Sequence, residues 1–356
     1  MRLFELGFDT AFQQDFADLD VQHCQPARVA RQDRDSYVLY GEGRAFRAQL
    51  PGVVRHRATS PLDFPAVGDW VAVERPFAGV GVIRAILPRR SAITRRAPGT
   101  AGGVQMLVAN VNSLLICCGL DNDYNLRRIE RYLSLAYGCG VSPIVVLTKA
   151  DVCADAAARE EEVTLAAVGA PVLALSGLRG DNVDALRALV PTGSTAALVG
   201  SSGVGKSTLV NRLMERELLE TRAVRAGDGR GRHTTTFRQL LLLPGGGVLI
   251  DTPGLRELQL AHGAADIDAS FADVAQLAAS CRFRDCAHES EPGCAVLAAI
   301  RAGEFSAARL ESFRKQQREM AYIDRKDDAA AFAAHKAKWK AVHKSAQRWM
   351  REKYRH

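Results

Sequence analysis

The sequence contains no long hydrophobic run. None of its apolar stretches approaches the ~20 residues that a membrane-spanning helix needs, so we predict no membrane span. The first residues, MRLFELGFDTAFQQDF, lack the basic start, apolar middle and small-residue cleavage site of a secretory signal. We therefore expect a soluble globular protein of the cytoplasm.

The sequence also lacks the regular cysteine spacing of a disulfide framework. Of its eight cysteines, three lie close together with a histidine, which is a pattern of metal ligation and favours a reducing compartment. We interpret the other five as core or incidental thiols: Cys24, Cys117, Cys118, Cys139 and Cys153.

Net positive charge is concentrated in two short segments. The formal net charge is +7, and residues 336–356 hold eight Lys/Arg against one Glu, so the remainder is close to neutral. A second excess lies in residues 75–96, which contain no acid. The arginines of this second segment are Arg75, Arg84, Arg89, Arg90, Arg95 and Arg96. Two such patches favour a polyanionic partner such as RNA.

Three different sequence patterns follow one another along the chain. Residues 26–96 contain short β-prone runs separated by Gly and Pro, which predicts a small β-barrel or sandwich. Apolar runs such as VNSLLICCGL and SPIVVLTKAD then alternate with helical stretches, as in a parallel α/β sheet. Such folds bind ligands at the carboxyl ends of the strands. Beyond residue 263 the chain is alanine-rich and predicted to be helical.

Residues 200–207, GSSGVGKS, satisfy the phosphate-binding pattern G-x-x-x-x-G-K-S between a strand-like and a helix-like segment. The glycines let backbone N–H groups face phosphate oxygens, Lys206 supplies a cation, and the Ser207 hydroxyl can bind Mg²⁺. The alternative is a glycine-rich turn with a surface lysine. The residues expected to hold the nucleotide here are Gly200, Ser201, Ser202, Gly203, Val204, Gly205, Lys206, Ser207 and Thr208.

A second phosphate element follows about 45 residues later. In GVLIDTPG, Asp251 ends an apolar strand and is placed to hold Mg²⁺ through water, while the N–H of Gly254 can sense the γ-phosphate. DTPG alone is a common turn, but after a phosphate-binding loop it indicates the second half of a nucleoside triphosphatase site.

Guanine is the predicted base. Thr148-Lys149-Ala150-Asp151 matches the T/N-K-x-D element, in which the carboxylate accepts two N–H groups of guanine that adenine cannot offer, and the lysine stem lies along the base. Ser176, after the run PVLAL, is the expected backbone contact to the base. The rival interpretation is a P-loop kinase or ATPase in which TKAD is accidental.

The base-reading elements precede the phosphate-reading ones, so the predicted GTPase domain is circularly permuted. The segment 191–196 would join the original termini of the domain. In this order, the switch segment after the phosphate site leads directly into the C-terminal part of the chain.

A metal cluster is predicted near the C-terminus. Residues 281–294 place Cys281, Cys286, His288 and Cys294 as C-x4-C-x-H-x5-C. Three thiolates and one imidazole suit one closed, structural, tetrahedral Zn²⁺ site. The alternative is three buried cysteines and an unrelated histidine.

The permuted set TKAD, LSG, GSSGVGKST, GRHTTT and DTPG, with VGDWV upstream and the cysteine cluster downstream, resembles the RsgA (YjeQ) family of small-ribosomal-subunit biogenesis GTPases over nearly the whole chain. The resemblance implies an N-terminal OB-fold β-barrel (1–104), a central α/β circularly permuted P-loop GTPase domain (105–262) and a mainly helical zinc-binding domain (263–356). It further implies a monomer that binds the small subunit and its rRNA, and hydrolyses GTP to GDP with stimulation by that subunit.

The residue that positions the attacking water is not the usual glutamine, because Leu255 follows DTPG. Slow intrinsic hydrolysis is expected. Within GRHTTT, His233 could position the water once a partner orders the loop, and Thr234 or Thr235 could close over Mg²⁺. The alternative is a solvent-exposed histidine. A second hypothesis for the whole chain is an RNA-binding protein that uses GTP only as a conformational ligand.

Overall fold

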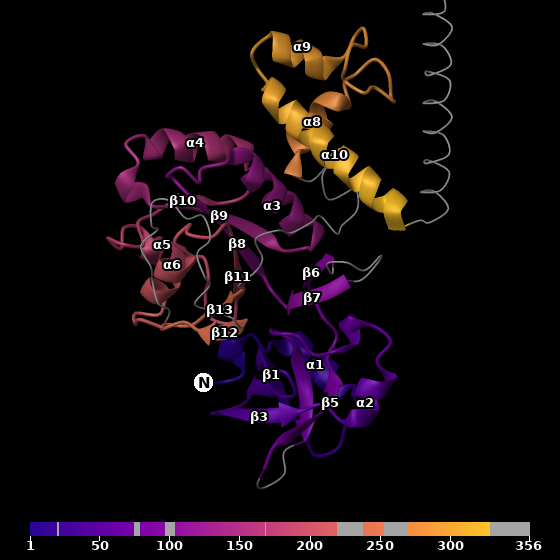
Figure 1. Cartoon of the computed structure of the whole chain (residues 1–356), viewed down its shortest axis with the longest axis vertical. Helices are drawn as coiled ribbons and strands as arrows, with labels where there is room; N and C mark the ends of the chain where they lie inside the picture. Colours follow the sequence, from indigo (N-terminus) through magenta and orange to yellow (C-terminus); the bar gives the residue numbers. More distant parts are fainter. Residues whose placement is uncertain are drawn as a thin grey trace, which may run out of the picture.

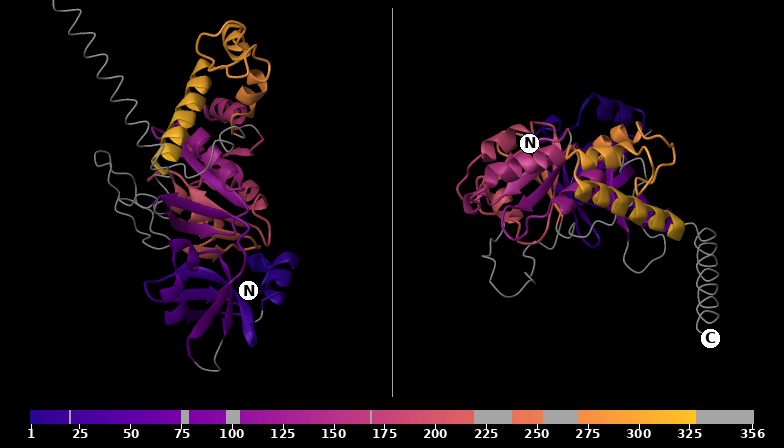
Figure 2. Two further views of the ribbon diagram at one scale, coloured as in Figure 1. Left: turned by 90° about the vertical axis from the view of Figure 1, so that its right-hand side faces the viewer. Right: turned by 90° about the horizontal axis from the view of Figure 1, so that it is seen from above.

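The computed structural model of the chain comprises three parts stacked in one direction, with the barrel at one end and the C-terminal helices at the other (Figures 1 and 2). None of the described helices combines the length and the apolar character needed to span a membrane. The structure describes residues 1–19, 21–74, 79–96, 104–167, 169–218, 238–252 and 270–327.

The N-terminal part is a closed five-stranded barrel, as the sequence predicts. Its strands are β1 (Cys24–Gln32), β2 (Tyr37–Tyr40), β3 (Ala45–Gln49), β4 (Trp70–Glu74) and β5 (Gly81–Ile86). They pair in the order β1-β2-β3-β5-β4, and β4 pairs back with β1. Alternate residues such as Val29, Leu39 and Ile83 fill the interior because side chains on a strand alternate between its two faces.

Short helical segments cover the barrel and connect its strands. They are η1 (Phe4–Leu6), α1 (Thr10–Ala17), α2 (Gly52–Arg57) and η2 (Pro61–Asp63). The side chains of Phe8 and Phe12 pack on the buried Trp70, with ring centroids 4.7 and 6.0 Å away. Trp70 lies next to the buried Asp69, so the VGDWV segment forms part of the packing between α1 and the barrel.

The central part is an α/β sheet whose neighbouring strands are parallel except for β12. The strand order is β10-β9-β8-β11-β13-β12. The strands are β8 (Ser113–Gly119), β9 (Ser142–Thr148), β10 (Val172–Ala174), β11 (Thr195–Val199), β12 (Gln239–Leu242) and β13 (Val248–Asp251). Every residue of β8 and β11 is buried, which explains why these strands read as continuous apolar runs.

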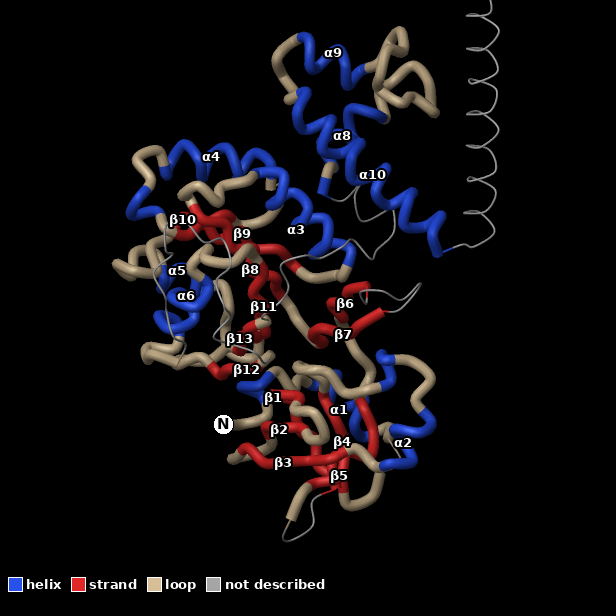
Figure 3. Tube along the Cα trace, viewed as in Figure 1, coloured by secondary structure: helices blue, strands red, loops and turns tan. Residues whose placement is uncertain are grey.

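Helices cover both faces of this sheet (Figure 3). The helices are α3 (Leu126–Gly138), η3 (Ala150–Val152), α4 (Ala156–Ala166), α5 (Val183–Ala188) and α6 (Lys206–Leu213). Leu114 and Ile116 of β8 share a core with α3 and α4, whereas Leu115 and Cys117 share the other core with α5 and α6. The period-two alternation of one buried strand therefore supplies both hydrophobic layers.

The barrel and the central sheet are continuous. Strand β1 pairs with β12 through Arg31 and Gln239, and the hairpin of β6 (Ala92–Arg96) and β7 (Val104–Ala109) connects the two parts. The buried Arg28 of β1 donates to the carbonyls of Leu6, Gly68 (3.1 Å) and Asn110 (2.8 Å) and to the hydroxyl of Thr195 (2.8 Å). Burial lowers the pKa of Arg28 to about 9, so the guanidinium stays charged at neutral pH.

The C-terminal part contains α8 (Ala272–Ala278), α9 (Ala295–Arg301) and α10 (Ala307–Asp327) around a separate core that includes Phe271, Val296 and Phe313. Helix α10 lies against α3 of the central part (Figure 1). Between these helices Glu130, which is 1% exposed, accepts hydrogen bonds from Arg309 (3.1 Å) and Ser312 (2.5 Å).

Candidate functional site: a nucleotide-binding loop and a metal centre

The loop at residues 200–205 joins β11 to α6 at the carboxyl edge of the sheet. Its three glycines have positive φ: 146° at Gly200, 76° at Gly203 and 97° at Gly205. A Cβ at Gly200 would lie 2.4 Å from the carbonyl oxygen of Cys117, so no larger residue fits that close approach to β8. The sequence motif therefore folds as the compact loop that its spacing predicts.

Lys206 begins α6 and folds back over this loop. Its ammonium donates to the carbonyls of Gly200 (2.7 Å) and Ser201. Ser207 and Thr208 follow in the first turn, where backbone N–H groups lack intrahelical partners and the helix dipole favours an anion. The arrangement combines one cation, one hydroxyl and a helix N-terminus, which is the donor set that binds phosphate oxygens.

The predicted base-reading residues lie beside the phosphate loop. Thr148, buried at the end of β9, donates from Oγ1 to the carbonyl of Val204 at 2.5 Å. Lys149 follows with φ 61°, and the N–H of Ala150 donates to the carbonyl of Leu175 at 3.1 Å. Thr148 thus touches the phosphate loop, although 56 positions separate it from Val204 in the sequence.

The loop that starts at Ser176 completes this side of the site. Ser176 is fully buried, and its Oγ accepts from the N–H of Arg179 at 3.0 Å. Arg212 of α6 donates to the carbonyl of Gly177 at 2.8 Å, and a Cβ at Gly177 would lie 3.4 Å from Thr208. These contacts hold the loop against the helix that carries the phosphate-binding residues.

Asp251 lies at the end of β13, next to β11 and the phosphate loop. Its carboxyl is 8% exposed, and burial raises its pKa although the charge of Lys206 acts in the opposite direction. The next residue, Thr252, donates from Oγ1 to the carbonyl of Leu198 at 2.5 Å. Four further predicted residues lie outside the described ones: His233, Thr234, Thr235 and Gly254.

Two acidic residues of this site were not singled out from the sequence. Asp121 pairs with Lys149, with 2.5 Å between Oδ2 and Nζ, and Asp123 accepts a hydrogen bond from Ser201 and pairs with Arg128 at 2.8 Å. The signal that could have revealed them is their place directly after the buried strand β8, at the edge where α/β folds bind ligands.

Three of the arginines interpreted as an RNA-binding patch pair with acidic residues within the protein. Arg89 forms two 2.8 Å bonds to the buried Asp69, Arg84 pairs with Glu74 at 2.5 Å, and Arg90 pairs with Asp15 at 2.8 Å. Burial alone would lower the pKa of Arg89, but Asp69 raises it. Arg89 also donates to the carbonyls of residues 62 and 64, so its role in the barrel is structural.

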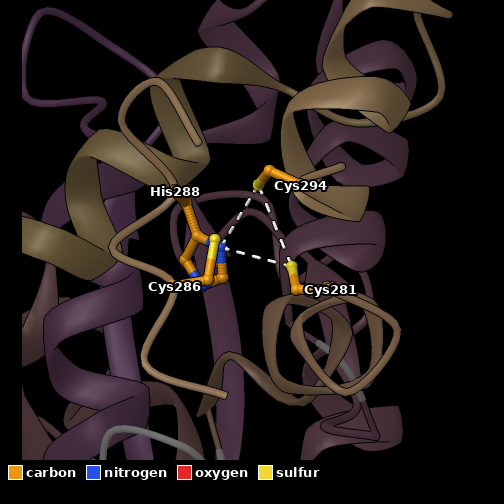
Figure 4. A group of neighbouring side chains, drawn as sticks. All are labelled: Cys281, Cys286, His288 and Cys294. Carbon is orange, nitrogen blue, oxygen red and sulfur yellow. Dashed lines mark hydrogen bonds between the residues drawn. The ribbon is translucent and has the colours of Figure 1, made fainter. Parts of the chain in front are cut away.

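The four predicted metal ligands converge in the C-terminal part (Figure 4). Their ligand atoms lie within 4.8 Å of one another. Sγ of Cys294 is 3.4 Å from His288 Nδ1 and 3.9 Å from Sγ of Cys281, and the distance from Cys281 to His288 is 3.6 Å. Tetrahedral zinc bonds of about 2.3 Å to sulfur and about 2.0 Å to nitrogen would separate such atoms by about 3.5–3.8 Å. The cluster therefore fits a tetrahedral metal ion.

A hydrogen-bonded loop supports the cluster. Glu291 accepts from the N–H groups of Ala287 (2.9 Å), Glu289 (2.8 Å) and Ser290 (3.0 Å). These backbone hydrogen bonds lower the pKa of Glu291 to about 2. Arg314 of α10 donates to the carbonyls of Ala287 and His288. The loop that carries His288 is thus stabilised both by its own hydrogen bonds to Glu291 and by Arg314 of α10.

Taken together, the parallel sheet, the phosphate loop after β11 and the earlier TKAD element after β9 define a circularly permuted P-loop GTPase. Solved structures share this fold: Thermotoga maritima YjeQ has a TM-score of 0.64 at 24% identity over 84% of this chain and 99% of its own. YloQ, described as a circularly permuted GTPase, has a TM-score of 0.59 at 20% identity over 86% of this chain and 96% of its own.

Sequence comparisons identify the family. The RsgA GTPase family matches residues 86–261, and a family of 50S ribosome-binding GTPases matches residues 195–346. "Small ribosomal subunit biogenesis GTPase RsgA 2" of Lactiplantibacillus plantarum is 45% identical over 90% of this chain and 90% of its own length. The relative named RsgA in Syntrophotalea carbinolica is 43% identical over 99% of both chains. The chain belongs to the RsgA family of GTPases.

Proposed function

We propose that this GTPase binds the small ribosomal subunit, assists its late assembly, and hydrolyses GTP to GDP and phosphate with stimulation by that subunit. Relatives named for biogenesis of the small subunit align with nearly the whole chain. The observation that supports the proposal most directly is the contact of Thr148 with Val204, which joins the TKAD segment to the phosphate loop. Assembly of ribosomal subunits would place the protein in the cytoplasm, where we expect a monomer.

The proposed nucleotide contacts follow from this geometry. Residues 200–208 would surround the phosphates, with Lys206 between the β- and γ-phosphates. Asp151 would accept the N1–H and N2–H groups of guanine, and Lys149 and Ser176 would cover and contact the base.

Ser207 and Asp251 would hold Mg²⁺. They fit because Ser207 offers a hydroxyl from the first turn of α6 and Asp251 offers a buried carboxylate at the end of β13, the strand that pairs with β11. The ion would neutralise charge on the phosphates. The N–H of Gly254 would contact the γ-phosphate. Positioning of water by His233 and closure over the metal by Thr234 or Thr235 stay predictions.

The flanking parts would provide the contacts with RNA. The strand order of the barrel, β1-β2-β3-β5-β4, supports its assignment as an OB-fold, a fold that often binds nucleic acid. We assign the domains as 1–104, 105–262 and 263–356. One structural Zn²⁺ held by Cys281, Cys286, His288 and Cys294 would stabilise the last of them, which suits the closed set of four ligands.

The test is GTP turnover with purified small subunits, and with large subunits as the matched control. We expect slow intrinsic hydrolysis and acceleration by small subunits alone. We also expect co-sedimentation with small subunits in a non-hydrolysable GTP analogue and release in GDP. Absence of product with small subunits would favour the second candidate, an RNA-binding protein that uses GTP as a conformational ligand. Equal competition by ATP would contradict the guanine assignment.

A further inference from the structure

We propose that Asp121 is a positioning residue for guanine nucleotides, which acts by holding Lys149 over the face of the base. The inference deepens the proposed function and rests on it. Its basis is the 2.5 Å contact between Asp121 Oδ2 and Lys149 Nζ, the residue of TKAD whose stem would lie along the purine.

The backbone around this pair is built to bring the two side chains together. Strands β8 and β9 end side by side: Gly119 pairs with Thr148, and the N–H of Leu120 donates to the carbonyl of Thr148 at 2.9 Å. Lys149 then adopts φ 61°, a left-handed conformation that is strained for a lysine and persists only where surrounding contacts enforce it.

The carboxylate of Asp121 is packed closely against the backbone and accepts a hydrogen bond from it. A Cβ at Gly119 would lie 2.6 Å from Asp121 Oδ1, so a larger residue at that position would displace the carboxylate. The N–H of Asp123 donates to the same Oδ1 at 3.1 Å. Partial burial would raise the pKa of Asp121, but the hydrogen bonds from Lys149 and from the Asp123 N–H lower it, so the group is a carboxylate at neutral pH.

The ion pair would therefore fix the ammonium at one end of the lysine and leave its four-carbon stem as a rigid wall for the base. A lysine held in this way loses less side-chain entropy when the nucleotide binds. Contact with the face of a purine does not depend on the exocyclic 2-amino group. Asp121 should thus strengthen binding of any purine nucleotide of this shape, whereas Asp151 should read the amino group.

The experiment measures the dissociation constants of GDP, GTP analogue and inosine triphosphate, which lacks the 2-amino group. For Asp121→Ala we expect the three dissociation constants to rise by the same factor, about two- to fivefold, and KM for GTP to rise by more than any fall in kcat. Asp121→Asn keeps a hydrogen-bond acceptor, so its dissociation constants should lie between those of the wild type and those of Asp121→Ala. Gly119→Ala should act in the same direction, because it displaces the carboxylate without removing it.

The matched control is Asp184→Ala, which removes an exposed carboxylate that pairs with Arg187 (2.9 Å) on α5 and should leave the constants unchanged. Nucleotide binding by Asp121→Ala equal to that of the wild type would overturn the inference. Tighter binding would also overturn it, because the pair would then hold the lysine away from the base. Failure of the wild-type protein to prefer GTP over ATP would instead contradict the proposed function. A drop in melting temperature with unchanged binding would indicate a purely structural role.

Discussion

Asp151 is the residue on which base selectivity should depend. A carboxylate only accepts hydrogen bonds, whereas the amide of asparagine presents one acceptor and one donor. For Asp151→Asn we expect GTP binding to weaken at least ~100-fold, because the amide donor would face the 2-amino group of guanine. Xanthosine triphosphate carries a carbonyl at that position and should bind the variant more tightly than GTP does. Competition titrations with the two nucleotides measure this change of base preference.

Preserved preference for GTP in this variant would mean that Asp151 does not face the base. The wild-type protein supplies the control, since it should bind xanthosine triphosphate weakly. Thermal unfolding without nucleotide separates a change of specificity from a loss of the fold, because the half-buried side chain of Asp151 contributes little to the core.

Asp251 illustrates a conflict between stability and function. Its carboxylate is buried, and burial raises its pKa by more than the charge of Lys206 lowers it, so ionisation opposes folding as long as no metal ion is bound. Because the folded pKa lies above the unfolded one, the cost is absent at low pH and develops as the pH rises through both values. Asp251→Asn should therefore melt at a higher temperature than the wild type at pH 7 without Mg²⁺ and nucleotide.

The same variant should hydrolyse GTP at least ~100-fold more slowly, because the amide cannot replace the negative charge that would hold the metal. Differential scanning calorimetry and phosphate release measure the two effects. A lower melting temperature at pH 7 together with normal hydrolysis would contradict this description of Asp251.

At the scale of residues, the sequence predicts what local spacing determines. The phosphate loop and the metal cluster are motifs of fourteen residues or fewer, so their geometry follows from the chain itself. Partners far along the chain could not be predicted in this way. Arg90 pairs with Asp15, and Asp123 with Ser201, only because the tertiary fold brings these segments together. Several arginines of the basic segment 75–96 therefore form ion pairs with acidic residues of the protein itself.

Helix α3 shows how one element connects two parts of the molecule. Ile129, Tyr132 and Leu133 form its apolar face on the sheet. Its second face carries Glu130 and Ser134, both buried, toward α10 and Ser270. A carboxylate and a hydroxyl on a buried helix face look like exceptions in the sequence, and only the packing of the C-terminal part accounts for them.

The Glu130–Arg309 contact should stabilise this helix pair. Glu130→Met leaves Arg309 buried with Asp273 as its remaining acidic partner among the described residues. We expect the free energy of unfolding to fall by about 3 kcal/mol, because a buried charge loses part of its compensation. The double variant Glu130→Met/Arg309→Met should be less destabilised than the sum of the single variants. Urea denaturation of the four proteins measures the coupling.

The pair of the exposed Asp184 with Arg187 serves as the control, and loss of the Asp184 carboxylate should cost no more than about 0.5 kcal/mol. Additive effects of the two substitutions would show that the contact between α3 and α10 contributes nothing specific.

At the scale of the molecule, the flanking parts are attached to the central one by different means. The barrel is joined to the central sheet by the pairing of β1 with β12, and it shares a hydrophobic core with α3. The C-terminal part has a core of its own and meets α3 through polar side chains. The sequence predicts three parts from their textures, but it could not predict this difference, since the pairing of Arg31 with Gln239 spans most of the chain.

This difference predicts that removal of the proposed zinc ion unfolds the C-terminal part alone. The ligands and the core around Phe271 and Phe313 belong to the C-terminal part, so chelation followed by transfer to Mg²⁺ buffer should abolish amide protection in α8 and α9. The central part should stay folded, because Glu130 would then be exposed to water, which can replace the hydrogen bonds from α10. Hydrogen exchange should show unchanged protection of β8 and β11, and the dissociation constant of GDP should change by less than about twofold. Restored zinc should restore protection of α8 and α9, whereas weakened GDP binding after chelation would show that the C-terminal part supports the nucleotide site directly.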